Sequence, residues 1–333
     1  MEKTPDVSIV VPLYNKQQYV KRALDSIINQ RCGASFEVVI VDDGSTDDSP
    51  AIVDVLAQDN DRLRMINQPN CGPGNARNRG VQESTGPLVA FLDADDEWAP
   101  DFLTLATSAL QAQPTAAAAA LAYRVVYPSG SVHQPTFRCE PPVGTAALLD
   151  NYFQTVLDGA YPICSSSVVI RRGVFEHLGG FPPLLRGEDT AFWSSMVLSY
   201  PVVFVNTVSA TVHLDADTAA RKAYRWVPAS SDDARYTLSP LDEALSGGLL
   251  PGPLAAAVRR YRAKRLADCI RQNVMCGHPD IARRLFAEFG HGTIESILRE
   301  PRVLLCLLGT LLPPALPRIY WDLRGFLWAA LKR

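Results

Sequence analysis

The sequence lacks paired cysteines and an excess of charge of either sign. Its seven cysteines are an odd number, widely spaced and without a C-x-x-C pair, which is typical of a reducing compartment. Lysine and arginine number 32 against 35 aspartates and glutamates, so the net charge of -3 provides no general basic field for nucleic acid. With 47% hydrophobic and 20% charged residues, the composition excludes a disordered chain and predicts a sizeable core.

Long apolar runs are also missing. No segment reaches the roughly 18 consecutive apolar residues of a membrane span. Met1–Asp6 shows no charged region leading into an apolar one, as a signal peptide would, and we therefore expect a cytoplasmic protein. The nearest approach is Val303–Leu316, which is followed by tryptophans and arginines. This C-terminal segment resembles a peripheral anchor at the inner face of a membrane, while a packed helix pair or a dimer contact explains it equally well.

The sequence does contain a regular alternation of strand and helix patterns. Short apolar, β-branched runs occur at residues 7–11, 36–41, 63–67 and 88–92, and segments with helical bias follow the first three of them. Pro12 marks the expected end of the first run. This alternation predicts a mostly parallel sheet with helices on both faces.

Beyond Trp98 the pattern becomes mixed. Helical spacing at 102–113 and 188–198 alternates with strand-like runs at 120–127, 165–171, 202–205 and 210–213. Residues 249–290 are rich in Ala, Arg and Leu at helical spacing, interrupted by Gly277-His278-Pro279. We therefore expect an α/β domain over residues 1–215, with halves at about 1–98 and 99–215, and a helical extension over 216–333.

Two common nucleotide-binding loops are absent. A dinucleotide-binding G-x-G-x-x-G loop should follow the first strand, where Pro12-Leu13-Tyr14-Asn15 stands instead. No G-x-x-x-x-G-K-[ST] loop occurs, which argues against a P-loop enzyme. A nucleotidylyltransferase is the nearest enzyme alternative, but it would need a basic glycine-rich loop after the first strand, and Lys16 and Lys21 are too sparse for that.

Acidic residues gather where the strands end. Asp42 and Asp43 follow the second run, and Asp93-Ala94-Asp95-Asp96 follows the fourth. Ligands of open parallel sheets bind beyond the carboxyl ends of the strands. Clustered carboxylates there repel one another unless they are solvated or bind a cation, and an all-oxygen site suits Mn²⁺ or Mg²⁺ bridging phosphate oxygens. The alternative is a solvated turn that caps the next helix.

Four segments in this order resemble family 2 glycosyltransferases of the GT-A fold. They are Val7 to Asn15, Val39 to Asp47, Gly74-Asn75-Ala76-Arg77-Asn78-Arg79-Gly80, and Phe91 to Asp96. Gly179-Gly180-Phe181, followed by Gly187-Glu188-Asp189, is similar to the acceptor-side motif of that family. The resemblance covers roughly the first 215 residues and implies a Rossmann-like mixed sheet, with residues 1–98 as the nucleotide-sugar half and 99–215 as the acceptor half.

The resemblance also implies roles for single residues on the donor side. Uracil and ribose would be held by Pro12, Tyr14, Asn15 and Asp43. Arg77 matches a donor-contacting position, although it could instead pair with Asp43. Asp93 and Ala94 would lie against the ribose. The metal would be held by Asp95, with Asp96 sharing that role and His213 reaching the metal or the diphosphate, unless His213 is structural.

On the acceptor side, Asp189 matches the general base of inverting members. A base of this kind must lie within hydrogen-bond reach of the acceptor hydroxyl. Glu188 would place the acceptor. Both acids could also serve the first turn of a helix, where negative charge is favourable.

The implied activity is transfer of a sugar from a nucleoside diphosphate sugar, with uridine as the default base, to an acceptor hydroxyl on a glycan or a lipid-linked glycan. Transfer would be metal-dependent, and a single displacement would invert the anomeric centre. From another class, a catalytically silent sugar-nucleotide-binding or scaffold protein would keep the same fold. The presence of both Asp95 and Asp189 argues against it.

Overall fold

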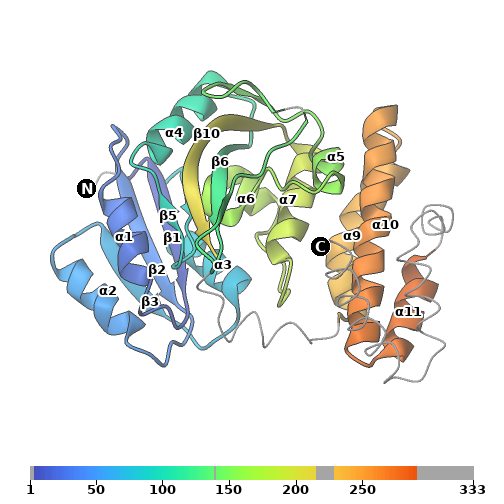
Figure 1. Ribbon diagram of the computed structural model, residues 1–333, viewed down its shortest axis with the longest axis horizontal. Helices are drawn as coiled ribbons and strands as arrows, with labels where there is room; N and C mark the ends of the chain where they lie inside the picture. Colours follow the sequence, from blue (N-terminus) through green and yellow to red (C-terminus); the bar gives the residue numbers. More distant parts are fainter. Residues whose placement is uncertain (1–3, 139, 215–228, 291–333) are drawn as a thin grey trace. The chain divides into compact units, whose positions relative to one another are not determined.

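The computed structural model describes residues 4–138, 140–214 and 229–290 (Figure 1). The chain divides into two compact units, 1–217 and 218–333. The C-terminal segment singled out above, from Val303 through Trp328, lies outside the described residues. Among the helices that are described, none is both long and apolar enough to cross a membrane.

The first unit is built on one mixed sheet. In the described part of the chain it has ten strands, eight of which follow the order β3-β2-β1-β4-β9-β6-β10-β5, while β7 pairs with β6 and β8 with β10. Their bounds are β1 (Val7–Leu13), β2 (Phe36–Asp42), β3 (Leu63–Asn67), β4 (Leu88–Phe91), β5 (Glu97–Trp98), β6 (Ala118–Val126), β7 (Val132–His133), β8 (Ala146–Leu148), β9 (Val168–Arg171) and β10 (Val202–His213).

Strand direction changes where the sequence pattern becomes mixed. Strands β1 to β4 pair in parallel, so their carboxyl ends meet at one edge of the sheet. Strand β9 runs antiparallel to both β4 and β6, while β10 returns parallel to β6. The predicted mixed α/β architecture is therefore confirmed.

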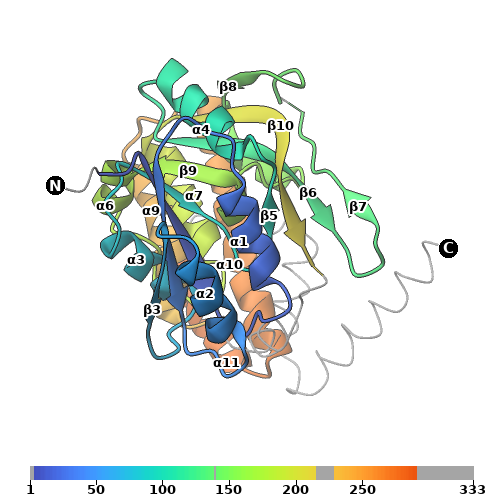
Figure 2. The ribbon, with the colours of Figure 1, turned by 90° about the vertical axis from the view of Figure 1, so that its left-hand side faces the viewer.

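Helices cover both faces of this sheet (Figures 1 and 2). One face packs against α1, α2 and α4 through a core that includes Leu24, Val53 and Phe102. The other face packs against α3, where Ala76 meets Val39 and Val41. The helix bounds in this unit are α1 (Val20–Ile28), α2 (Ser49–Gln58), α3 (Pro73–Gln82), α4 (Phe102–Ala112), α5 (Tyr152–Leu157), α6 (Arg172–His177) and α7 (Glu188–Ser199), with a 3₁₀ turn at Ser165–Ser167.

Two strand predictions need correction. Strand β1 does not stop at Pro12 but runs on to Leu13. Pairing with β4 ends at Val10, so Pro12 lies where only β2 flanks the strand, and a missing N–H is tolerated there. The two runs expected at 202–205 and 210–213 are a single strand, β10, whose register against β6 shifts between Val205 and Ala210.

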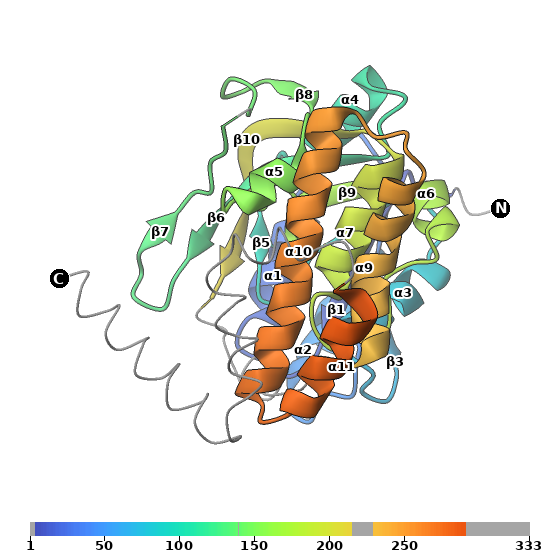
Figure 3. The ribbon, with the colours of Figure 1, turned by 90° about the vertical axis from the view of Figure 1, so that its right-hand side faces the viewer.

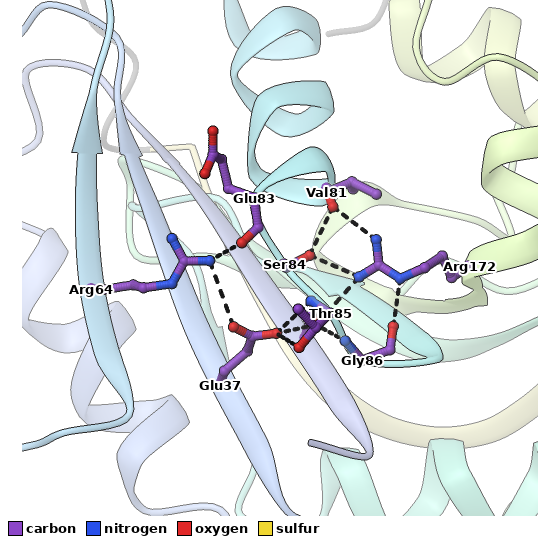
Figure 4. Close-up of polar contacts among 9 residues, drawn as sticks. Glu37, Arg64, Val81, Glu83, Ser84, Thr85, Gly86 and Arg172 are labelled. Atoms are coloured by element: carbon purple, nitrogen blue, oxygen red, sulfur yellow. Dashed lines mark hydrogen bonds and ion pairs between the residues drawn. The ribbon is translucent and has the colours of Figure 1, made fainter. Parts of the chain in front are cut away.

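A polar network ties the strand starts together, at the edge opposite the carboxyl ends (Figure 4). Glu37 of β2 accepts a hydrogen bond from the backbone N–H of Thr85 at 2.7 Å and pairs with Arg64 of β3 at 3.7 Å. Arg172, the first residue of α6, fixes the exit of α3. Its guanidinium donates to the carbonyl of Val81 at 2.8 Å, the hydroxyl of Ser84 at 2.8 Å and the carbonyl of Gly86 at 2.6 Å.

The described part of the second unit contains three helices, α9 (Ser231–Ser246), α10 (Gly252–Met275) and α11 (Pro279–Phe289) (Figure 3). A break at residues 277–279 was predicted, and α10 ends at Met275 while α11 begins at Pro279. Helix α9 lies within the predicted helical extension, but no separate helix was recognised there, because its sequence is polar and carries Pro240 in its interior. Leu238, Ile270 and Leu285 form part of the shared apolar core of the three helices.

Candidate active site

The loop after β1 is fixed to the loop after β2. Asn15 adopts a left-handed backbone conformation with φ of 52°, which asparagine tolerates better than most residues. Its backbone N–H donates to the hydroxyl of Ser45 at 3.0 Å, and its side-chain oxygen accepts from the N–H of Thr46 at 2.8 Å. These bonds hold the predicted donor residues at the end of β1 and just after it on the carboxyl edge, where Tyr14 is exposed and Pro12 is half-buried.

Asp43 is buried and organises the segment that leads into α3. One carboxylate oxygen accepts from the Gln68 side chain and from the N–H of Cys71, both at 2.8 Å, and the other accepts from the N–H of Gly72 at 2.9 Å. Gly72 has φ of 89°, a conformation that favours glycine. Asp43 therefore shapes the predicted base pocket and does not pair with Arg77.

Ser166 fixes the acidic turn that follows β4. The hydroxyl of this buried serine accepts from the N–H of Asp93 at 3.2 Å and donates to Asp96 at 2.5 Å. The second oxygen of Asp96 accepts from the N–H of His213 at 2.9 Å, so both oxygens of this carboxylate bind the surrounding fold. Ala94 is buried in the core. Asp96 is buried as well, so Asp93 and Asp95 are the more accessible acids of the turn.

Arg77 joins the donor side to the acceptor side. Its guanidinium donates to Asp93 at 2.6 Å and to Glu188 at 3.0 Å, and it lies over the ring of Phe181. A Cβ atom at Gly74 would lie 2.9 Å from Cγ of Glu188, so any larger residue there would displace the Glu188 side chain or separate α3 from the start of α7. Asn78, one residue after Arg77, exchanges two hydrogen bonds of 2.8 Å with the backbone of Phe181.

The electrostatics of this cluster follow from its burial. Burial favours the neutral form of Arg77, but Asp93 and Glu188 outweigh it and raise the pKa of the guanidinium. Burial raises the pKa of Glu188, with a further contribution from Asp189, while Arg77 opposes the shift. Burial also raises the pKa of Asp96 well above its ordinary range, and the carboxylates of Asp93 and Asp95 add to this effect.

Asp95 is paired with basic groups of the segment that follows β1. Its carboxylate accepts from the Lys16 ammonium at 2.5 Å, and its backbone carbonyl accepts from the Arg22 guanidinium at 2.5 Å. Burial raises the pKa of Asp95, Lys16 opposes this shift, and Asp93 adds to it. The ring of His213 lies 3.2 Å from Glu97.

Glu188 and Asp189 are the first two residues of α7, after Gly187 in a left-handed conformation. Glu188 is buried against Arg77, whereas Asp189 is half-buried and accepts hydrogen bonds from Thr190. Both acids therefore lie in the first turn of α7, and Glu188 in addition contacts Arg77 of the donor half.

Three residues of the site were missed by the sequence reasoning. Ser166 lies in a run that was interpreted as strand, and nothing in its local pattern distinguishes it. Lys16 and Arg22 follow the first motif, so their position beside the acidic turn could have been inferred from the parallel pairing of β1 and β4. In the part of the chain that the structure describes, no three His, Cys, Asp or Glu side chains form a ready-made metal centre.

Comparison with known proteins identifies the family of this chain. The family model described as glycosyl transferase family 2 matches residues 8–179. An uncharacterised glycosyltransferase, YibD of Escherichia coli, is 41% identical over 112 residues, which are 33% of this chain and 32% of that protein. Hyaluronan synthase of Pasteurella multocida is 35% identical over 132 residues, covering 40% of this chain and 14% of the synthase. The chain thus spans about a third or less of the length of these curated relatives.

Solved structures share the fold at low identity. TarS 1-349 of S. aureus, in complex with UDP-GlcNAc, superposes with a TM-score of 0.59 at 18% identity, covering 91% of this chain and 79% of TarS. The mannosyltransferase PcManGT of Pyrobaculum calidifontis, in complex with GDP-Man and Mn²⁺, gives 0.51 at 20% identity, covering 96% of this chain and 88% of that one. Because the family model matches more than half of the residues, the chain belongs to glycosyltransferase family 2.

Proposed function

We propose that this protein transfers a sugar from a nucleoside diphosphate sugar to an acceptor hydroxyl with inversion at the anomeric carbon. The observation that carries the proposal is the Arg77 bridge. It joins Asp93, in the acidic turn of the donor half, to Glu188, which precedes Asp189 at the start of α7. A donor and an acceptor hydroxyl bound on either side of this bridge would meet between the acidic turn and Asp189.

The donor would bind at the carboxyl edge, where ligands of parallel sheets bind. Pro12, Tyr14 and Asn15 would line one side of the nucleoside and the segment shaped by Asp43 the other. The fold neighbours bind UDP-GlcNAc in one case and GDP-Man in another, so either base is compatible with this fold. We keep UDP as the first donor nucleotide to test.

The residues of the acidic turn suit a hard divalent cation. Asp95 offers carboxylate oxygen, the ligand type that Mg²⁺ and Mn²⁺ prefer, and the shortage of other protein ligands suits an ion that is completed by phosphate oxygens and water. Asp96 and His213 would fix the position of the turn that carries Asp95, because the two oxygens of Asp96 already accept hydrogen bonds from Ser166 and from the backbone N–H of His213. A bound ion would neutralise the charge that develops on the departing diphosphate.

Asp189 is the proposed base. Its carboxylate is half-buried at the start of α7, beside the Glu188 that pairs with Arg77, so it is placed to accept the hydroxyl proton as the new glycosidic bond forms. Glu188, committed to Arg77, would position the acceptor. Relatives that include a hyaluronan synthase and a succinoglycan biosynthesis protein support a glycan, free or lipid-linked, as the acceptor class.

The experiment that tests the proposal measures release of nucleoside diphosphate from UDP- and GDP-sugars, with and without Mn²⁺ or Mg²⁺. Asp95→Asn keeps the side-chain shape but weakens the negative ligand, so metal-dependent donor turnover should be lost. Asp25→Asn, whose carboxylate forms an exposed pair with Lys21, is the control and should remain active. A silent binding or scaffold protein would bind nucleotide but release no product from any donor, and that result would contradict the proposal.

A further inference from the structure

Lys16 pairs with Asp95, the residue proposed above to hold the metal ion. Its ammonium lies 2.5 Å from one carboxylate oxygen of Asp95, and each of the two side chains keeps only 18% of its exposure. The two residues are 79 positions apart in the chain, so the fold and not local sequence brings them together. An exposed ion pair would be worth little, but this one lies in a partly buried acidic cluster.

The backbone holds Lys16 in this place. Its N–H donates to the hydroxyl of Ser49 at 2.8 Å, and Ser49 is fully buried at the start of α2. Asn15, in its left-handed conformation, is fixed to the loop after β2 by two further hydrogen bonds. The Cα of Lys16 is therefore anchored, while its four-carbon side chain can turn without moving the loop.

Each acid of the turn has its own protein partner. Asp93 pairs with Arg77, Asp96 accepts from Ser166 and His213, and Asp95 pairs with Lys16. The charge of Asp95 is thus already neutralised. A free divalent ion gains little at a carboxylate that holds an ammonium, because the two cations compete for the same oxygen.

We infer that Lys16 is an internal counter-ion that makes metal binding depend on the nucleotide. A nucleoside diphosphate brings negative charge to which the ammonium can turn, and it brings phosphate oxygens that complete the coordination of the metal. Metal and diphosphate then bind together, each strengthening the other, and neither binds strongly alone. Lys16 is a residue that sets metal affinity and is not itself a catalytic residue. The inference rests on the proposed function, since it takes the diphosphate as ligand.

Mn²⁺ binding to the full chain tests this inference. Free Mn²⁺ is measured by electron paramagnetic resonance during titration, without nucleotide and with UDP, in the wild type and in Lys16→Met. We expect Mn²⁺ to bind the variant more tightly than the wild type when no nucleotide is present. The enhancement by UDP, expected in the range of about 5–150-fold for the wild type, should shrink in the variant.

Three further variants make the result specific. Lys16→Arg keeps the positive charge and should bind Mn²⁺ alone as weakly as the wild type. Lys21→Met removes a lysine of the same segment whose exposed partner is Asp25, and it should change nothing. Lys16→Gln removes the charge but keeps a hydrogen-bond donor, and it replaces the methionine variant if that one does not fold.

Unchanged Mn²⁺ affinity in both uncharged variants, measured without nucleotide, would overturn the inference. Failure of the proposed function gives a different result. A silent nucleotide-binding protein would bind UDP but release no product from any donor sugar, and a protein that uses no nucleotide donor would not bind UDP with or without Mn²⁺. In both cases the affinity for Mn²⁺ alone still reports whether Lys16 competes at Asp95.

Discussion

Replacing Arg77 with methionine tests how the two halves of the site are joined. The guanidinium is 5% exposed and pairs with Glu188, which is 9% exposed, and with Asp93, which is 35% exposed. Methionine keeps an unbranched apolar stem but removes the guanidinium, and with it the charge and the group that lies over the Phe181 ring. Glu188 is then left as a buried carboxylate without a cation.

The expected loss of stability comes mainly from Glu188. Removing one partner of a buried ion pair costs about 3–5 kcal/mol, because the remaining charge is neither paired nor solvated. The bond to Asp93 adds little, since water screens that half-exposed carboxylate. We therefore expect the free energy of unfolding of Arg77→Met to fall by about 3–5 kcal/mol at pH 7.5.

This loss should depend on pH in a definite direction. The folded-state pKa of Glu188 is already raised above its ordinary value of 4.5, and removing Arg77 raises it further, because the cation opposes the shift. A carboxyl group with a raised pKa favours folding below its unfolded pKa and loses that contribution as pH rises through the folded value. The variant should therefore lose less stability at pH 5 than at pH 7.5.

Urea unfolding at the two pH values measures these effects. Arg79→Met is the matched control, because Arg79 lies in the same helix and forms an exposed pair with Glu83 that should contribute less than about 1 kcal/mol. Adding Glu188→Gln to Arg77→Met removes the uncompensated charge and should restore most of the loss. Equal destabilisation at both pH values, together with no rescue by the glutamine, would refute the reasoning.

Two other predictions concern the proposed base and the network at the opposite edge. Asp189→Asn should reduce the single-turnover transfer rate by roughly 10²–10⁴ while donor affinity stays within a few-fold, and near-normal transfer would exclude Asp189 as the base. Arg172→Ala should lower the free energy of unfolding by about 1–3 kcal/mol, measured in urea, because buried acceptors at the exit of α3 lose their donor. A loss below about 0.5 kcal/mol would mean that water replaces the guanidinium there.

Much of the first unit was predictable because its first half is regular. Strands β2, β3 and β4 lie within one residue of their predicted ends, since buried parallel strands are continuous apolar runs. Errors arose where local pattern and tertiary context disagree. Strand β10 continues through a polar stretch at which the sequence pattern predicted two separate strands, and α9 continues past Pro240 in its interior.

The sequence by itself determined the class of protein and the edge of the sheet at which its chemistry lies. Turn-forming acids after β2 and β4 must meet at one edge once those strands pair in parallel, so Asp43 and the turn from Asp93 to Asp96 could be placed without coordinates. The motif order was sufficient to identify the family, and the family model confirms it over residues 8–179.

Only the tertiary structure decided which charges are paired. Arg77 and Glu188 are 111 positions apart, Lys16 and Asp95 are 79 apart, and Ser166 and Asp96 are 70 apart. Whether such side chains meet depends on the direction that each loop gives to its Cα–Cβ bond, which no pattern of residue types specifies. The close approach of α3 and α7 at Gly74 is likewise a property of two packed elements. Because of this packing Arg77 pairs with Glu188, while Asp43 accepts hydrogen bonds from the segment before α3.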